Sequence, residues 1–389
     1  MYNSELYVGG DFSMAGGNTA KYIATWDGSN WSQPGNGTDG SVSALTNYGS
    51  NLIVGGNFSV PSGNISYHAI ASWNGSTWSS VGTGMGFLCS MPTYPGSWVL
   101  GLTTWNSSLY AIGNFLTAGG HNVCSIAKWD GANWSALGSG LNQSGNALGV
   151  YNSELYAGGF VLSSGIGKWN DTTWSSVGSG ITGGVKSLAV YNGELYVGGA
   201  FTSAGGVPAN YIAKWNGTSW SSVGGGMDSI VFALTSYNGN LYAGGSFRAA
   251  GGNLVHHIAK WNGTNWLPLG AGTDTTVTAL AVYNGDLYVG GAFTQAGGNS
   301  ANYIAKWNEP VNVEESKKTK INIYPNPTTG KLYVEGGNLK EIKLSDVLGK
   351  EILTTLEKEI DLGDLQNGIF FAQVRTSEGV SVQKVIILK

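Results

Sequence analysis

Carboxylates in turns are the first groups through which this chain could do chemistry. Asp27 and Asp130 each precede a glycine in one kind of predicted turn, whereas Glu154, Glu194 and Asp286 recur in another kind. A glycosidase needs two carboxylates that converge across one cleft. Acids repeated in turns point outward instead, so we predict no catalytic residues in this part of the chain.

Metal binding is the second possibility. The four histidines are His68, His121, His256 and His257. They fall in predicted loops of three repeats, His256 and His257 in the same one, where hydrogen-bonded or solvated roles are the expectation. The loop acids Asp11, Asp39, Asp228 and Asp274 lack the D-x-D-x-D spacing that gathers oxygens around calcium. Calcium binding is therefore an open alternative that the sequence supports only weakly. We predict no metal ligand and no cofactor.

Aromatic residues in one irregular loop give the best hint of ligand binding. The segment GFLCSMPTYPGSW spans 86–98 and contains Phe87, Tyr94 and Trp98. Strand packing does not require aromatic residues in a loop, so we predict these three as ligand-binding residues. The alternative is that the loop folds over the sheets and buries them.

Cys89 and Cys124 are the whole cysteine count. Both fall in loops predicted for the same face of the same repeat. We predict a disulfide between them, as an oxidising extracellular location permits. The alternative is two small buried hydrophobic residues.

The elements that position these groups come from an internal repeat. Its marker tryptophans are spaced 47, 56, 40, 46, 46 and 46 residues apart. They are Trp26, Trp73, Trp129, Trp169, Trp215, Trp261 and Trp307. A period near 46 falls in the range of propeller blades. The ten extra residues of the longest interval lie in the 86–98 loop.

Each repeat predicts four short antiparallel strands, called a to d. Strand a alternates apolar and small residues, and Asn-Gly or a near equivalent then forms a tight turn with positive φ angles. Strand b reads LYVGG, strand c reads YIAKW, and strand d begins at a second tryptophan. Such a sheet has two apolar faces, so neighbours must stack and close into a ring. The aromatic residues are then explained by packing between blades.

The predicted fold is all-β. We expect a seven-bladed β-propeller over 1–308, with six blades as the alternative. Met1-Tyr2-Asn3 aligns with the end of strand a in other repeats, and the last repeat has no marked strand d. We therefore expect the natural chain to continue upstream, with a d strand and an a strand that complete the ring, and a signal peptide before them. The loops between d and a and between b and c lie on one face, where we expect a ligand to bind.

The repeat pattern resembles kelch-type propellers, and more closely the repeats of Rax2-like cell-surface proteins. The resemblance covers nearly all of 1–308. It departs from the kelch pattern in carrying WNG where kelch repeats usually have a Tyr-Asp pair.

Residues 309–389 differ in composition from the repeats. The first 310 residues contain 8 Lys and Arg and 12 Asp and Glu, whereas the last 79 contain 11 of each. Residues 309–320 are polar and charged, which indicates a linker that should be protease-sensitive. Residues 321–389 predict roughly seven short strands in a small C-terminal Ig-like β-sandwich.

Several ordered motifs in 321–389 resemble the type A C-terminal sorting domain of the Bacteroidetes type IX secretion system. They are YPNPTTG at 324–330, D-x-x-G at 346–349, LQNGIFFAQV at 365–374 and a closing strand that ends at the last residue. Their defining residues are Tyr324, Pro325, Asn326, Pro327, Gly330, Gly349, Gly368 and Lys389. The plain alternative is an accessory Ig-like domain.

The resemblance implies export to the cell surface, at the outer face of the outer membrane, or release. It also implies two partners, the type IX machinery and a sortase-like peptidase that removes the domain. The net charge of −4 excludes the basic surface that nucleic acid requires, and no segment predicts a membrane span. We expect a non-catalytic binding or adhesion module for an extracellular glycan or protein. The alternative is a polysaccharide lyase or glycosidase on the same scaffold.

Overall fold

The computed structural model describes residues 1–62, 65–86, 98–307, 321–336, 338–347, 349–377 and 380–389. The chain divides into two compact units, Met1–Asn308 and Glu309–Lys389. Strands dominate both units, and the described residues add one short 3-10 helix, η1 (Val161–Ser163). The prediction of an all-β fold is confirmed.

Seven antiparallel sheets follow one another along the described part of the first unit, and we number them 1 to 7. Sheet 1 contains β1 (Leu6–Gly9), β4 (Ile23–Trp26) and β5 (Trp31–Ser32). Sheet 2 contains β6 (Val42–Tyr48), β7 (Asn51–Ser62), β8 (Ile65–Trp73) and β9 (Trp78–Ser80). Sheet 3 contains β11 (Trp98–Trp105), β12 (Ser108–Asn114), β15 (Ile126–Trp129) and β16 (Trp134–Ala136).

The next four sheets follow the same order. Sheet 4 contains β17 (Gly145–Tyr151), β18 (Glu154–Gly159), β19 (Ile166–Trp169) and β20 (Trp174–Ser176). Sheet 5 contains β21 (Ile181–Tyr191), β22 (Glu194–Ala204), β24 (Ile212–Trp215) and β25 (Trp220–Ser222), with β23 (Val207–Pro208) paired to β22. Sheet 6 contains β26 (Val231–Tyr237), β27 (Asn240–Gly245), β30 (Ile258–Trp261) and β31 (Trp266–Pro268). Sheet 7 contains β32 (Val277–Tyr283), β33 (Asp286–Gly291) and β36 (Ile304–Trp307).

Short hairpins lie in the loops between strands b and c. They are β2 (Met14–Ala15) with β3 (Asn18–Thr19), β13 (Thr117–Ala118) with β14 (His121–Asn122), β28 (Ala249–Ala250) with β29 (Asn253–Leu254), and β34 (Gln295–Ala296) with β35 (Asn299–Ser300). β10 (Met85–Gly86) adds a third strand to the pair β13–β14. These hairpins share one face of the unit with the loops between strands d and a.

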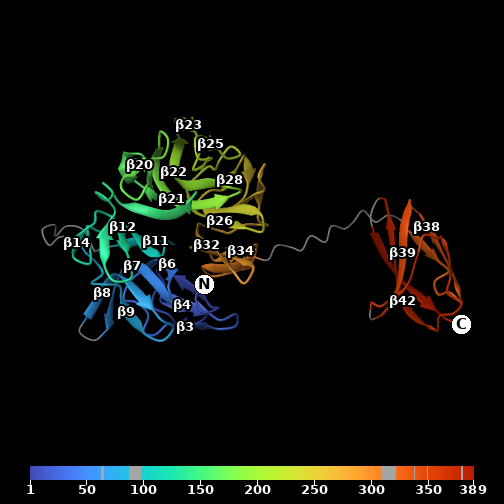
Figure 1. The fold of residues 1–389 in the computed structure, drawn as a ribbon. Helices are drawn as coiled ribbons and strands as arrows, with labels where there is room; N and C mark the ends of the chain where they lie inside the picture. Colours follow the sequence, from blue (N-terminus) through green and yellow to red (C-terminus); the bar gives the residue numbers. More distant parts are fainter. Residues whose placement is uncertain (63–64, 87–97, 308–320, 337, 348, 378–379) are drawn as a thin grey trace. The chain divides into compact units, whose positions relative to one another are not determined.

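The sheets are arranged as a ring (Figure 1). The strands in position a contact one another from β6 through β11, β17, β21 and β26 to β32, which places them at the centre. A tyrosine at the end of strand a donates its hydroxyl to a backbone carbonyl in the a–b turn of the next sheet. The last of these bonds joins Tyr283 of sheet 7 to Ser4, 2.8 Å away, beside sheet 1. It therefore links the two ends of the series.

Tryptophan packing confirms the structural interpretation of these residues. The indoles that end strand c and begin strand d lie with ring centroids 5.0–5.3 Å apart in sheets 1 to 6. Trp134, Trp220 and Trp266 are buried and donate to backbone carbonyls of the preceding sheet at 2.9–3.1 Å. The indoles thus supply apolar contact and one polar bond at the same interface.

The paired glycines that end strand b have a steric cause. At the first of them, as in Gly158 and Gly198, a Cβ would overlap Cγ1 of the valine that follows in strand a of the next sheet, Val185 or Val231. Both valines are fully buried. Glycine therefore permits the close approach of neighbouring sheets.

The second unit encloses a core of its own between two sheets. One contains β37 (Asn322–Tyr324), β38 (Lys331–Glu335) and β41 (Glu359–Asp361). The other contains β40 (Glu351–Thr355), β39 (Leu339–Asp346), β42 (Gly368–Thr376) and β43 (Val380–Ile387). Leu332, Ile342, Leu344, Ala372 and Val374 are fully buried between them. The seven strands among the described residues agree with the number expected.

Candidate functional site

The predicted aromatic loop is only partly described. Phe87, Tyr94 and Cys89 lie outside the described residues. Trp98 begins β11 and has 41% of its surface exposed, at the face that carries the d–a and b–c loops. Cys124 is half-buried in a loop on that face. The predicted disulfide therefore stays a prediction.

Sequence reasoning missed a second exposed aromatic ring on this face. Phe160 follows the two glycines of β18 and is 50% exposed. The equivalent residues of the other sheets are small or polar. They are Asp11, Asn57, Asn114, Ala200, Ser246 and Ala292. The shortened loop of sheet 4 was visible in the sequence, and the phenylalanine at its start was the available signal.

The histidines whose side chains the structure describes are not gathered into a metal site. His121 is exposed in β14, whereas His257 is buried in the loop that leads to β30. Burial lowers the pKa of His257, with Arg248 as the next cause. No cluster of three His, Cys, Asp or Glu side chains able to hold a metal occurs among the residues that the structure describes.

Aspartates in the d–a loops hydrogen-bond to other loops on the face that carries the d–a and b–c loops. The Asp228 carboxylate accepts hydrogen bonds from the backbone N–H groups of Arg248 and Ala249, at 2.9 and 3.0 Å. Asp274 accepts in the same way from Thr294 and Gln295, and the Thr294 hydroxyl donates to it at 2.7 Å. That hydroxyl is the largest cause of the lowered pKa of Asp274. Asp39 likewise accepts from the backbone N–H of Ser59, so three of the four acids considered for calcium bond to the chain that follows strand b.

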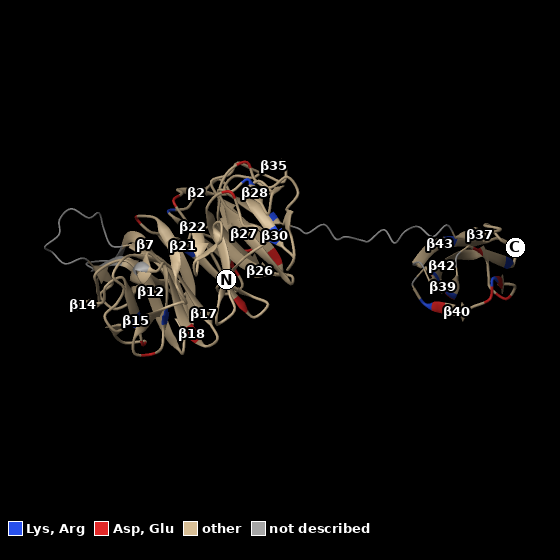
Figure 2. Cartoon of the chain, turned by 90° about the horizontal axis from the view of Figure 1, so that it is seen from above, with Lys and Arg blue, Asp and Glu red and all other residues tan. Residues whose placement is uncertain are grey.

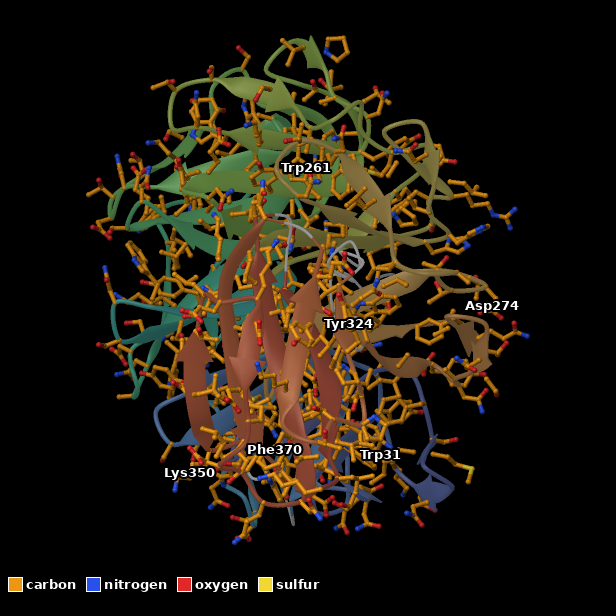
Figure 3. The ribbon with its side chains drawn as sticks, turned by 90° about the vertical axis from the view of Figure 1, so that its right-hand side faces the viewer. Trp31, Trp261, Asp274, Tyr324, Lys350 and Phe370 are labelled. Atoms are coloured by element: carbon orange, nitrogen blue, oxygen red, sulfur yellow. The ribbon has the colours of Figure 1, made fainter. Side chains whose placement is uncertain are left out.

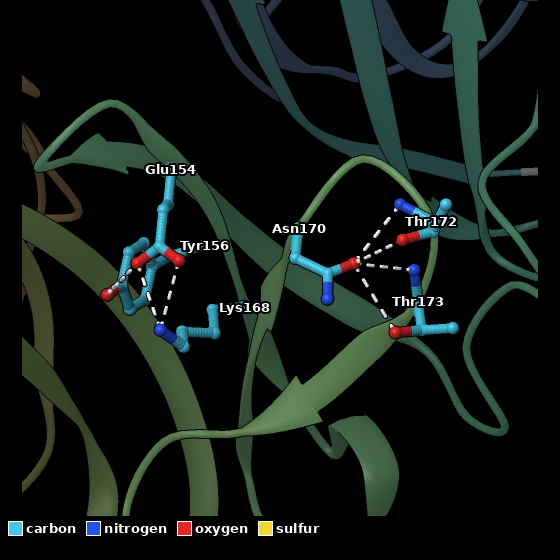
Figure 4. A network of polar contacts seen from close by, with 6 residues as sticks. All are labelled: Glu154, Tyr156, Lys168, Asn170, Thr172 and Thr173. Carbon is cyan, nitrogen blue, oxygen red and sulfur yellow. Dashed lines mark hydrogen bonds and ion pairs between the residues drawn. The ribbon is translucent and has the colours of Figure 1, made fainter.

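Acids on the opposite face also have structural partners. Glu154 pairs with Lys168 at 3.0 Å and accepts a bond from the hydroxyl of Tyr156, whose pKa is raised by burial and by Glu154 (Figure 4). Glu194 with Lys214 and Asp286 with Lys306 repeat the ion pair in other sheets. Charged residues are otherwise sparse over the sheets (Figure 2).

The c–d turns are closed by an asparagine or aspartate side chain. Asn170 Oδ1 accepts from the backbone N–H groups and hydroxyls of Thr172 and Thr173 (Figure 4). Asp27 and Asp130 accept two backbone N–H groups each, with charged carboxylates. Backbone donors, those of Asn30 and Asn133 foremost, lower the pKa values of these two groups. The sequence predicted that these acids lie in turns, and their hydrogen bonds show that they also organise those turns.

In the second unit, the YPNPTTG segment is joined to the last strand. Asn326 donates from Nδ2 to the carbonyl of Lys384 at 2.6 Å and accepts at Oδ1 from the N–H of Ile386 at 2.9 Å. The backbone of Thr328, which is 1% exposed, bonds to Ile386 and Leu388. The segment and the closing strand therefore form one structure although 58 residues separate Asn326 from Lys384.

Other motif residues of this unit complete its turns and its C-terminus. Lys389 donates its backbone N–H to Asn367 Oδ1 at 2.7 Å, directly before Gly368. Gly349 has a φ of 81° and closes the turn between β39 and β40, where its N–H bonds to the carbonyl of Asp346. Tyr324 stacks on Tyr333 with ring centroids 5.9 Å apart. Tyr324 and Lys350 lie at separate places in the unit (Figure 3), so the D-x-x-G turn is apart from the YPNPTTG segment.

Two family models match parts of the chain. Residues 322–388 match the model described as the secretion system C-terminal sorting domain. Residues 192–216 and 284–309 match a β-propeller domain of unknown function, DUF5122. The chain is thus an all-β protein in which a β-propeller precedes a secretion-system sorting domain. This tail implies export by the type IX secretion system, to the cell surface or beyond it.

Solved structures resemble the chain only distantly. The computationally designed Ika8 protein has a TM-score of 0.45 and 14% identity, over 93% of this chain and 90% of that one. PorZ, a surface component of the type IX secretion system of Porphyromonas gingivalis, has a TM-score of 0.45 and 13% identity, over 94% of this chain and 56% of that one. YjhT has a TM-score of 0.40 and 13% identity, over 68% and 96%. No curated protein matches the sequence.

The described part of the chain contains no helix with the length and apolar character needed to cross a bilayer.

Proposed function

We propose that this chain is an extracellular, non-catalytic binding module on a seven-bladed, kelch-like propeller. The type IX machinery delivers it to the outer face of the outer membrane. The observation that carries the proposal is the sorting domain at 322–388, whose YPNPTTG segment is bonded to the closing strand. The seven sheets and the bond from Tyr283 to Ser4 support the blade number.

The second unit acts as an export signal with an Ig-like fold. The secretion machinery recognises it, and a sortase-like peptidase removes it after transport. Support comes from the separate core of this unit, which is built from its own two sheets.

Binding without turnover is supported by the roles of the acids. The carboxylates of Glu154, Glu194 and Asp286 pair with lysines, and those of Asp228 and Asp274 brace loops. Side chains engaged in such bonds are poorly placed to act as general acid and base.

The proposed ligand surface is the face of the d–a and b–c loops. Trp98 and Phe160 are 41% and 50% exposed there, and exposed aromatic side chains give much contact area at low cost in conformational entropy. An extracellular polysaccharide or protein is the proposed ligand.

Arrays of glycans and proteins probed with the full chain test this proposal. We expect saturable binding to at least one ligand, weakened in Trp98→Ala and Phe160→Ala, and no product from a matched polysaccharide panel. Val282→Ala, which changes an exposed side chain beside the a–b turn of sheet 7 on the opposite face, is the control. Product release at enzyme-like rates would show a lyase or glycosidase instead. The absence of both binding and product would indicate a structural spacer.

A further inference from the structure

An open pocket of about 540 Å³ lies on the opposite face of the ring, between the a–b turns of sheets 2 and 3. Asn47, Tyr48 and Gly49 line it from sheet 2, and residues 104–107 line it from sheet 3. Its volume falls within the roughly 300–1,000 Å³ of small-molecule sites. The proposed ligand surface on the loop face does not include this pocket.

The pocket coincides with a break in the repeat. At five a–b turns the tyrosine that ends strand a is buried, with 2–9% of its surface exposed. These are Tyr2, Tyr151, Tyr191, Tyr237 and Tyr283. Tyr48 is half-buried, and its bond to the carbonyl of Ser107, 3.3 Å long, is exposed. Trp105 takes the tyrosine position in sheet 3 and is 9% exposed. Its ring is therefore held by packing beside the opening.

One missing side chain and two polar replacements set this pocket apart from the other turns. Gly49 stands where the six other turns carry asparagine, and a Cβ placed on it would meet no atom within 4 Å. Asn47 and Thr104 stand where sheets 4, 5 and 7 carry valine. Asn47 donates from Nδ2 to the carbonyl of Met1 at 2.6 Å, which orients its amide. The pocket thus has amide and hydroxyl groups where the equivalent turns of sheets 4, 5 and 7 have apolar side chains.

The lining is also uncharged. Asn51 and Ser108 occupy the positions at which Glu154, Glu194 and Asp286 form ion pairs in other sheets. The lining residues offer two amides, three hydroxyls and two aromatic rings. Amides and hydroxyls both donate and accept hydrogen bonds, and aromatic rings pack against C–H faces. A neutral sugar presents that combination of hydroxyls and C–H faces.

We propose that this pocket binds a neutral saccharide unit, as a site separate from the loop face. The inference goes beyond the proposed function and does not depend on Trp98 or Phe160. Charged sugars bind less well because the lining holds no charged group to pair with them.

Titration of the full chain with glucose, galactose, mannose, N-acetylglucosamine and glucuronate, followed by saturation-transfer NMR, tests the inference. We expect at least one neutral sugar to bind saturably and glucuronate to bind more weakly. The double variant Asn47→Val/Gly49→Asn restores the common repeat and fills the pocket. It should lower the affinity about tenfold or more, because it removes a hydrogen-bonding group and adds steric overlap.

Matched controls separate the pocket from other effects. Val190→Asn/Asn192→Gly makes the reverse change in the turn of sheet 5, and Trp98→Ala alters the loop face. Both should leave the affinity unchanged. If the double variant does not fold, Thr104→Val replaces it and should also lower the affinity for the neutral sugar. The inference fails if no neutral sugar binds saturably, or if the pocket variants bind like the parent while array binding at the loop face persists.

Discussion

At the scale of single residues, short side chains in turns determine local structure. Asn74, Asn170, Asn216 and Asn262 accept backbone N–H groups in the c–d turns of four sheets. Asp27 accepts the same bonds at 2.7 Å in sheet 1, and Asp130 accepts them at 2.7 and 2.8 Å in sheet 3. Both carboxylates are fully exposed, so their charge matters for pH dependence more than for net stability.

Replacing the two aspartates should therefore flatten the response of stability to acid. The lowered pKa values of Asp27 and Asp130 mean that their charged forms favour the fold above the unfolded pKa near 4. This contribution is lost as the pH falls through the folded pKa values. We expect the melting temperature of Asp27→Asn/Asp130→Asn to match the parent near pH 7 and to fall less below about pH 4. Thermal unfolding followed by circular dichroism measures this.

Asp171→Asn is the control for that pair. It changes the same charge in the same kind of turn, but Asn170 is the acceptor there. An identical acid response in the double variant and the parent would contradict the assigned cause of the lowered pKa values.

The cysteine pair gives a second prediction at this scale. Cys124 is half-buried, and its expected partner Cys89 lies outside the described residues. We expect protein recovered from the culture medium to show no reactive thiol before reduction and two after it, measured by alkylation and mass spectrometry. Two thiols labelled in the unfolded, unreduced chain would exclude the disulfide.

At the scale of strands and sheets, tyrosine hydroxyls tie six of the seven sheets to the next, sheet 3 being the exception. Tyr237 bonds to Gly285 and Tyr283 to Ser4, both at 2.8 Å and partly buried. The bond of Tyr48 is longer and exposed, at 3.3 Å. A buried carbonyl that loses its donor costs more than an exposed one, which water can satisfy.

Removing these hydroxyls should have unequal effects. We expect Tyr283→Phe to lower the free energy of unfolding by about 1 kcal/mol, with Tyr237→Phe similar and Tyr48→Phe close to neutral. Urea unfolding of the three variants measures the order. Equal losses would show that the bond joining sheets 7 and 1 is not better shielded from water than that of Tyr48.

The sequence predicted the elements better than their contacts. The tryptophan spacing of about 46 placed the strands, and the Asn-Gly turns placed the hairpins, because both signals are local. The tyrosine bonds were not predicted, because their acceptors are backbone carbonyls that any residue supplies. The pocket escaped notice for a related reason, since Asn47 and Gly49 are ordinary turn residues. Their significance appears only when equivalent positions of the seven sheets are compared. In that comparison Trp105 replaces a tyrosine, Asn47 replaces a valine and Gly49 replaces an asparagine.

At the scale of the whole molecule, each unit has its own core. The buried cluster that contains Leu332 and Val374 draws on residues 321–387 alone. The clusters between sheets draw only on residues before 308, as with Trp220 and Phe247. A unit with a complete core retains its fold when a neighbour is removed.

Deleting residues 321–389 in a native host should therefore separate export from folding. We expect the truncated chain to keep the thermal unfolding transition of the propeller and to remain in the periplasm, because the sorting domain is lost. Cell fractionation and surface proteolysis measure the location. A matched variant, Asn326→Ala, removes the two bonds to the last strand while keeping the domain, and we expect a partial loss of export. Unchanged surface delivery of the truncated chain would contradict the role of this unit in export, whatever the propeller binds.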